Sequence, residues 1–125
     1  MTDIKYDLEE RLINFSVAMI KLTEKFPRSF PGNNLANQLG RSGTAPALNY
    51  GEAQSAESRN DFIHKMKICL KELRETNICL KIVERLCWFE KGCLFPYIKE
   101  CNELVSIFVK SIHTAEKNRH INKTK

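Results

Sequence analysis

The chain has 125 residues, of which 42% are hydrophobic, which is enough for one domain with a buried core and excludes an intrinsically disordered protein. Its formal net charge of +5 favours an acidic partner such as nucleic acid, although proteins that bind none also carry such a charge. No apolar stretch approaches the ~20 residues that cross a bilayer, and charged residues begin at Asp3 without a signal peptide, so we expect a soluble, cytoplasmic protein.

The first predicted helix spans about residues 3–26 and has two apolar stripes. The main stripe repeats at alternating steps of four and three residues and consists of Leu8, Leu12, Phe15, Met19, Leu22 and Phe26. The second stripe points away from the first by well over a right angle and consists of Tyr6, Ile13, Val17 and Ile20. Either the helix packs between neighbours inside one subunit, or the second stripe is an interface with another chain.

The second predicted helix spans about residues 35–56 and follows a loop at residues 27–34, in which Asn33 or Asn34 would be the N-cap. Small residues dominate this helix and allow a neighbouring helix to approach closely, while its glycines weaken it. Pro46 removes one backbone hydrogen bond, so we expect a kink there.

The third predicted helix begins at Ser58, whose hydroxyl can cap it, and ends near Lys91 with Gly92 as its C-terminal cap. It carries the strongest periodic signal of the chain, an apolar stripe of Phe62, Met66, Cys69, Leu73, Thr76, Leu80, Val83 and Cys87. The fourth predicted helix runs from Pro96 to about Lys117, with an apolar stripe of Phe95, Ile98, Cys101, Val105, Phe108, Ile112 and Ala115.

Four helical segments with short links, and no strand-like alternation, predict an all-α fold. The expected architecture is an antiparallel, up-down-up-down four-helix bundle with a kinked second helix. We expect residues 1–118 to form this single domain and residues 119–125 to be a basic, flexible tail.

Three polar residues of the second helix lie near one face, namely Arg41, Asn49 and Glu52. They could form a hydrogen-bonded network with Arg59 or Glu72 of the third helix. One interpretation is a ligand or catalytic pocket. The other, which we favour, is a polar network that fixes helix register or a subunit contact, because partly buried charges need partners.

A basic row follows one line of the third helix, opposite its apolar stripe, and consists of Lys67, Lys71, Arg74, Lys81 and Arg85. Neighbours in such a row are about 5–6 Å apart, which suits a phosphate backbone. The alternative is an ordinary solvated helix face, with Ile78 in its middle. The region from Lys110 to Lys125 is also basic and could attract RNA or DNA without specificity, or only aid solubility.

The sequence lacks the signatures of common catalytic and cofactor-binding sites. Cys87, Cys93 and Cys101 form no C-x-x-C pair, and no histidine pattern fits a zinc module or a di-iron bundle. A P-loop, a G-x-G-x-x-G motif and a nucleophile elbow are absent as well. We therefore expect no metal, no cofactor, no small-molecule substrate and no enzyme activity.

Four short motifs in the middle of the chain resemble those of a known family. They are Gln38-Leu39-x-Arg41-Ser42, Asn49-x-x-Glu52, Glu57-Ser58-Arg59-x-Asp61-Phe62-Ile63-x-Lys65 and Lys71-Glu72-Leu73-Arg74-Glu75-Thr76. On these residues the sequence resembles the bacterial four-helix bundle protein family, also called the 23S rRNA intervening-sequence protein family, over about residues 8–90. It departs from the family's pattern at residues 45–47 and at Ala53.

The resemblance implies an antiparallel bundle without established enzyme activity that assembles as a homo-oligomer, arranged as a ring for which a pentamer is one candidate. Some members are encoded inside insertions in ribosomal RNA genes, and a related basic group is an accessory to retroelement reverse transcriptases, so RNA association is implied by analogy. Two hypotheses follow. The chain is a nucleic-acid-binding homo-oligomer that uses the basic row, or it is a protein-interaction scaffold or accessory subunit that binds no nucleic acid.

Overall fold

The computed structural model describes the backbone of residues 4–124 and the side chains of residues 8–118. Residues 4–124 contain four helices and no strand: α1 Ile4–Thr23, α2 Phe30–Gln54, α3 Arg59–Arg85 and α4 Phe95–Thr124. The predicted all-α four-helix bundle is thereby confirmed. None of the helices within this range is long and apolar enough to span a membrane.

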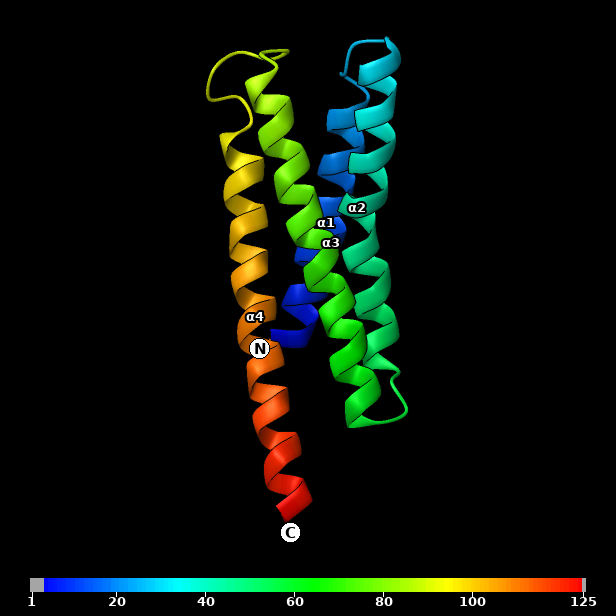
Figure 1. The fold of residues 1–125 in the computed structure, drawn as a ribbon, viewed down its shortest axis with the longest axis vertical. Helices are drawn as coiled ribbons and strands as arrows, with labels where there is room; N and C mark the ends of the chain where they lie inside the picture. Colours follow the sequence, from blue (N-terminus) through cyan, green and yellow to red (C-terminus); the bar gives the residue numbers. More distant parts are fainter. Residues whose placement is uncertain (1–3, 125) are drawn as a thin grey trace.

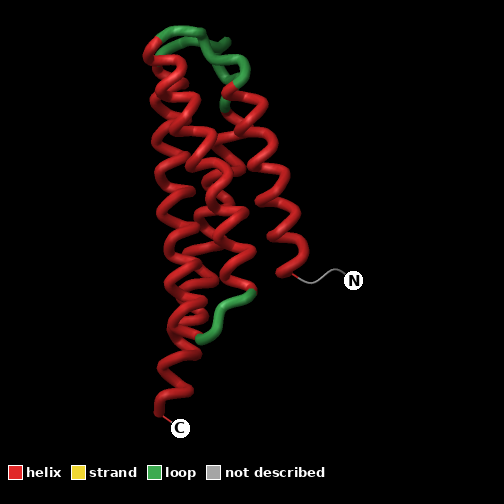
Figure 2. The backbone as a smooth tube through the Cα atoms, turned by 90° about the vertical axis from the view of Figure 1, so that its right-hand side faces the viewer, coloured by secondary structure: helices red, strands yellow, loops and turns green. Residues whose placement is uncertain are grey.

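Successive helices run in opposite directions, so that α1 and α3 end at one end of the bundle, where α2 and α4 begin (Figure 1). Each helix packs along the next one in the chain, whereas α1 and α4 meet at far fewer positions. Within the described residues, the backbone of α1 does not come close to that of α3, nor the backbone of α2 to that of α4, so these pairs lie diagonally across the bundle. Toward its N-terminus α1 leans away from the other helices (Figure 2).

The sparse seam between α1 and α4 is bridged by ion pairs. Arg11 Nη2 lies 2.6 Å from Glu100 Oε1 and 3.1 Å from Glu103 Oε1. All three side chains are partly exposed, and ion pairs of this kind contribute little to stability. The seam therefore depends on few apolar contacts and on charges that salt can screen.

The core lies between the four helices and comes from the predicted apolar stripes. Leu12, Met19, Leu73, Leu80 and Phe108 are almost completely buried. The Phe108 ring packs edge-on against the ring of Tyr50 from α2, with centroids 6.0 Å apart. At the far end Phe26 packs against the rings of Trp88 and Phe89, which ties the two loops of that end together.

Helix α2 begins earlier than predicted, at Phe30 instead of Leu35. Its N-cap is Ser29, whose side chain accepts a hydrogen bond from the Gly32 amide, and not Asn33 or Asn34. The prediction was wrong because it took the Phe-Pro-Gly sequence as a loop, although proline in a first turn costs no hydrogen bond.

Helix α3 ends at Arg85, six residues before the predicted end at Lys91. Cys87 adopts a left-handed conformation with φ of 59°, which a continuing helix excludes. Gly92 has the positive φ expected of a cap, 85°, but it lies in the turn before α4. Ser58 is confirmed as the N-cap of α3, with its hydroxyl accepting a hydrogen bond from the Asp61 amide at 3.0 Å.

Two members of the predicted apolar stripes are solvent-exposed, which corrects their assignment to the core. Cys87 lies beyond the end of α3, and Phe95 is the first residue of α4 and 62% exposed. Leu104, which the stripe of the fourth helix omitted, is fully buried. The backbone of α4 continues to Thr124, and the flexibility of residues 119–125 stays a prediction, because their side chains lie outside the described residues.

Helices α1 and α2 approach closely at Gly43. A Cβ added there would lie 2.7 Å from Met19 Cγ and 2.8 Å from Met19 Cβ, so the α1 backbone would have to move. Pro46 lies inside α2 and is buried, and the helix is continuous through it from Phe30 to Gln54. The kink at this proline stays a prediction.

Candidate nucleic-acid interface and polar cluster

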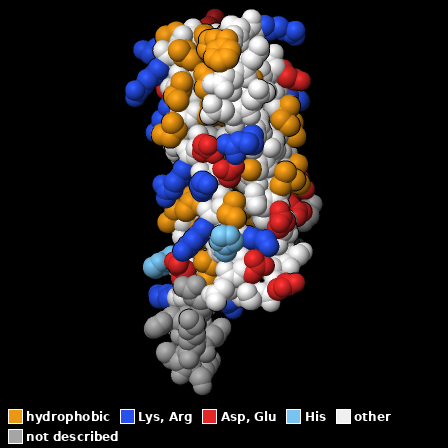
Figure 3. Space-filling view, turned by 45° about the vertical axis from the view of Figure 1, so that its right-hand side comes forward, with side chains coloured by type: hydrophobic (Ala, Val, Ile, Leu, Met, Phe, Trp, Pro, Cys, Tyr) orange, Lys and Arg blue, Asp and Glu red, His pale blue; other side chains and the backbone are white. Residues whose placement is uncertain are grey.

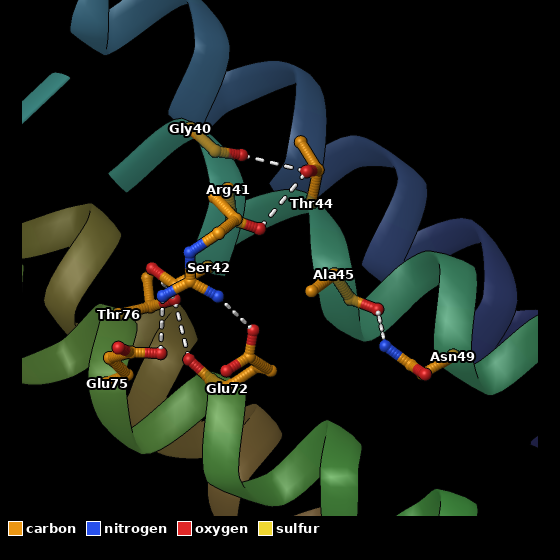
Figure 4. A network of polar contacts seen from close by, with 9 residues as sticks. All are labelled: Gly40, Arg41, Ser42, Thr44, Ala45, Asn49, Glu72, Glu75 and Thr76. Atoms are coloured by element: carbon orange, nitrogen blue, oxygen red, sulfur yellow. Dashed lines mark hydrogen bonds and ion pairs between the residues drawn. The ribbon is translucent and has the colours of Figure 1, made fainter. Parts of the chain in front are cut away.

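A polar cluster joins the middle of α2 to the middle of α3 (Figure 4). The Arg41 guanidinium lies between two carboxylates, with Nη1 2.6 Å from Glu72 Oε2 and Nη2 2.8 Å from Glu75 Oε2. Beside it, the hydroxyls of Ser42 and Thr76 are hydrogen-bonded at 2.9 Å, and both residues are buried. The cluster therefore fixes the register of α2 against α3 at one level of the bundle.

Three residues of the predicted polar motif lie apart from this cluster. Asn49 donates from Nδ2 to the Ala45 carbonyl of its own helix, at 2.9 Å. Glu52, near the end of α2, and Arg59, the first residue of α3, are exposed. Asn49 and Glu52 were predicted to join the cluster because helical spacing puts them near the same face of α2 as Arg41.

Glu75 belongs to the cluster but was not among its predicted members. The signal was present, because Glu75 follows Glu72 at the i+3 spacing that puts two side chains on one helix face. A guanidinium has a fork of donors that can serve two carboxylates. The pair Glu72 and Glu75 was thus a predictable partner for a single arginine.

Burial raises the pKa of the Glu72 carboxyl above its usual value, and the nearby Glu75 adds to this effect, while Arg41 opposes it. The pKa of Glu75, which is half-exposed, is lowered, chiefly by its hydrogen bond with Arg41. Arg41 therefore acts to lower the pKa of both neighbouring carboxyls and favours their ionised forms.

We expect an Arg41→Met variant to lose more stability near neutral pH than in mild acid. A carboxyl whose pKa is raised by folding binds more protons in the native state, so the stability it contributes falls as pH rises through that range. Without Arg41 the pKa of Glu72 rises further, and Glu75 loses the partner that lowered its own. Urea denaturation at about pH 5 and about pH 7 measures the difference.

The matched control is the double variant Arg41→Met with Glu72→Gln. It lacks the same arginine but has no buried carboxyl, so its stability should depend less on pH than that of the single variant. Equal pH dependence in the two variants would contradict the role given to Glu72.

Three of the five cysteines have the environments of packing residues, and Cys87 and Cys93 are exposed. Cys69, Cys79 and Cys101 are buried, and burial raises the pKa of Cys69 to about 12 and that of Cys101 to about 12. Thiols with such pKa values are neutral and poor metal ligands. Among the described residues, no group of three or more His, Cys, Asp or Glu side chains could hold a metal ion.

Three of the hollows on the surface formed by residues 8–118 have volumes of about 500 to 530 Å³ each. They lie along α4, at the turn between α3 and α4, and between the start of α3 and the second half of α4. Arg59 of the polar motif lines the third hollow, whereas Arg41, Asn49, Glu52 and Glu72 line none of the three, so the motif as a whole does not line one pocket.

All five members of the basic row are exposed on α3. Among the described residues, Lys67 is the member of the row that forms an ion pair. Its Nζ lies 3.1 Å from Glu116 Oε2 of α4. Arg74 and Lys81 lie three residues before and four after Asn77, whose amide donates to Asn102 of α4 at 2.9 Å. The row therefore leans toward the α4 side of α3.

The second stripe of α1 is exposed on a chain taken alone. Ile13, Val17 and Ile20 are 43%, 45% and 46% exposed, respectively. Tyr6 lies in α1 as well, and its side chain falls outside the described residues. The described part of the stripe is thus an apolar ridge without a partner inside the bundle.

The 23S rRNA-intervening sequence protein family model matches residues 5–110, most of the chain. The chain belongs to this family. A solved structure of a protein of unknown function from the S23 ribosomal protein family of Bacteroides thetaiotaomicron is similar to it, with a TM-score of 0.78 and 27% identity over 84% of this chain and 97% of that one. A comparison with curated proteins gives no match.

The match to the 23S rRNA-intervening sequence protein family includes the polar cluster, the basic row and the ridge of α1. It stops within α4, so the basic residues at the end of the chain lie beyond the part that the family model covers.

Proposed function

We propose that this member of the 23S rRNA-intervening sequence protein family is a non-enzymatic, cytoplasmic homo-oligomer that binds RNA, or another nucleic acid, through the basic row. The observation that carries the proposal is the row itself. Five cations are exposed along one helix, and among the described residues only Lys67 is engaged in an ion pair. Cations that are free to replace counterions are what a phosphate backbone binds.

The side chains of the basic row are suited to contacts with phosphates and not to recognition of individual bases. Its side chains are those of Lys and Arg, and the residue between them, Ile78, has no aromatic face on which a base could stack. The proposed binding is therefore to backbone charge and shape, with weak dependence on sequence.

The RNA proposal predicts a large loss of affinity when three cations of the row are neutralised together. In Lys71→Gln, Arg74→Gln, Lys81→Gln, loss of three phosphate contacts should weaken binding by about 100-fold at ~0.1 M salt. It should also reduce the slope of affinity against salt by roughly 2 to 3. A titration of structured RNA at about 50 mM and about 200 mM salt measures both.

The control variant carries the same loss of charge elsewhere, at three exposed lysines: Lys25→Gln, Lys91→Gln, Lys99→Gln. It should bind nearly as the native chain does. Equal weakening of RNA binding in both variants would mean that net charge alone accounts for the affinity. Absence of binding by the native chain at low salt would contradict the proposal.

Assembly is supported by the apolar ridge of α1. A helix face with three half-exposed, large aliphatic side chains is more apolar than a lone bundle needs. We expect Ile13→Glu with Val17→Glu to abolish association while leaving the helical content intact, because the core stripe is untouched. Light scattering gives the mass and circular dichroism the helicity.

The matched control lowers the charge of α1 by the same two units at exposed polar positions, as Asn14→Glu with Lys21→Gln. It should keep the mass of the native oligomer. An unchanged mass in the Ile13 and Val17 variant, or a native chain that is monomeric, would contradict the proposed homo-oligomer.

A second candidate function, a protein-interaction scaffold, is favoured by two aromatic side chains at one end of the bundle. Phe30 is 87% exposed at the start of α2, and Phe95 is 62% exposed at the start of α4. Pull-down from lysate treated with nuclease separates the two functions. RNA binding is favoured if nuclease removes the partners and the triple variant of the basic row also loses them. The scaffold is favoured if the partners survive nuclease but are lost in the variant Phe30→Ser, Phe95→Ser.

A further inference from the structure

The start of α3 and the second half of α4 border a hollow of about 500 Å³. At this end of the bundle α4 continues past the start of α3 (Figure 1), and α1 leans away from the other helices (Figure 2). No described residue of α1 lines the hollow. It is therefore a space beside two packed helices that the described part of the first helix leaves open.

The lining of the hollow combines apolar and polar side chains. Phe62 of α3 and Ile107 of α4 are partly buried and give it an aromatic and an aliphatic surface. It is also lined by polar side chains, which are those of Arg59, Lys110, Ser111, Thr114 and Asn118. A hollow of this size with an apolar surface and a few polar groups is typical of a site for a small ligand.

The polar groups of the hollow are free to bind such a ligand. Arg59, Lys110, Ser111 and Thr114 make no side-chain hydrogen bond or ion pair with another described residue. Arg59 is also the first residue of α3, where the positive end of the helix dipole favours an anion. Two cations and two hydroxyls without partners are the kind of donors that bind a phosphate.

No carboxylate of the described residues lines the hollow and competes for its cations. The acidic residues that come nearest to it along the two helices are Asp61 and Glu116, and each pairs with a lysine. Asp61 Oδ1 lies 3.2 Å from Lys65 Nζ, and Glu116 Oε2 lies 3.1 Å from Lys67 Nζ. An anionic ligand would therefore meet cations whose charge is not already neutralised.

We propose that this hollow binds a single nucleotide, with the base against Phe62 and Ile107 and the phosphate held by Arg59 and Lys110. The aromatic ring decides for a nucleotide over a bare phosphate, because every base has a face that stacks on a ring. The ligand is a free nucleotide or the terminal nucleotide of an RNA, since both carry a planar base and a phosphate.

The inference goes beyond the proposed binding of RNA by the basic row. The row has cations but no aromatic side chain, whereas the hollow has both. The two sites share no residue, so each can be tested without the other. A row that fails to bind structured RNA would leave the hollow as a nucleotide site.

The test uses 5′-AMP as the ligand and isothermal titration calorimetry as the measurement. The native chain should bind 5′-AMP saturably. Adenosine lacks the phosphate and inorganic phosphate lacks the base, so each should bind more weakly by about 10-fold or more. Inorganic phosphate that binds as tightly as 5′-AMP would overturn the proposal, because the apolar surface would then contribute nothing.

Two variants assign the binding to the hollow. In Arg59→Gln, Lys110→Gln, the loss of two charged contacts should weaken binding of 5′-AMP by about 10- to 100-fold. Phe62→Leu keeps an apolar side chain but removes the ring, and it should weaken binding by about 10-fold. Circular dichroism of each variant verifies that its helices are intact.

The loss of charge needs a control, because Lys and Arg side chains occur along most of the length of the face shown in Figure 3. Lys25→Gln, Lys91→Gln removes two exposed cations from the opposite end of the bundle. This variant should bind 5′-AMP as the native chain does. Equal weakening in the two double variants would overturn the site, since net charge alone would then account for the affinity.

Two short single-stranded RNA oligonucleotides distinguish the sources of the nucleotide, one with a 5′-phosphate and one with a 5′-hydroxyl. Tighter binding of the first, lost in Arg59→Gln, Lys110→Gln, assigns the hollow to the end of an RNA. Binding of 5′-AMP with no difference between the oligonucleotides assigns it to a free nucleotide. No binding of 5′-AMP together with no such difference would overturn the proposal.

Discussion

Replacing Phe108 by alanine should lower the free energy of unfolding by about 3–5 kcal/mol. Phe108 is fully buried in the middle of α4 and packs against the Tyr50 ring of α2, the diagonally opposite helix. Its removal leaves a cavity where side chains of more than one helix meet, so relaxation of one helix cannot fill the space. Urea denaturation at neutral pH measures the loss.

The neighbouring residue gives a control in the same helix. Val109 is 43% exposed, and Val109→Ala should change the free energy of unfolding by well under ~1 kcal/mol. Comparable losses in the two variants would mean that Phe108 does not hold the central place that the packing gives it.

Adding a methyl group at Gly43 should cost about 1–3 kcal/mol of stability, because the new Cβ would meet Met19 Cγ at 2.7 Å and Met19 Cβ at 2.8 Å. These atoms are close to the α1 backbone, so α1 and α2 would have to separate. The strain should lower both the free energy of unfolding and the melting temperature of Gly43→Ala.

The same substitution at Gly40, one turn earlier in α2, should have the opposite sign. A Cβ at Gly40 meets nothing within 4 Å, so Gly40→Ala gains helix propensity of about 0.5–1 kcal/mol without strain. Stabilisation by both substitutions would show that α1 and α2 do not approach each other as closely as Gly43 indicates.

Periodicity predicted most of the fold because most of the core obeys it. The stripes of α1 and α3 name the residues that are buried, from Leu8 to Phe26 and from Met66 to Val83. The errors lie at helix ends. The start of α2 depends on the Ser29 side chain, and the end of α3 depends on the left-handed Cys87, and neither changes the apolar pattern.

The polar cluster was predictable only as a set of candidates. Helical spacing puts Arg41, Asn49 and Glu52 near one face, but it cannot say which of them the neighbouring helix reaches. That depends on the register between α2 and α3, which brings Arg41 to Glu72 and leaves Asn49 to bond its own backbone. The register between two helices depends on how their surfaces pack together, and the sequence of one helix does not specify it.

The thin seam between α1 and α4 leaves α1 with one extensive packing partner, α2. It is packed along α2, but toward α4 it depends on few contacts and on the fork of Arg11 with Glu100 and Glu103. Local opening with α1 as its unit would break fewer contacts than detachment of α2 or α3. Within an assembly, a loosely held first helix is also the segment that two copies could exchange, so subunits could be replaced without unfolding the remaining three helices.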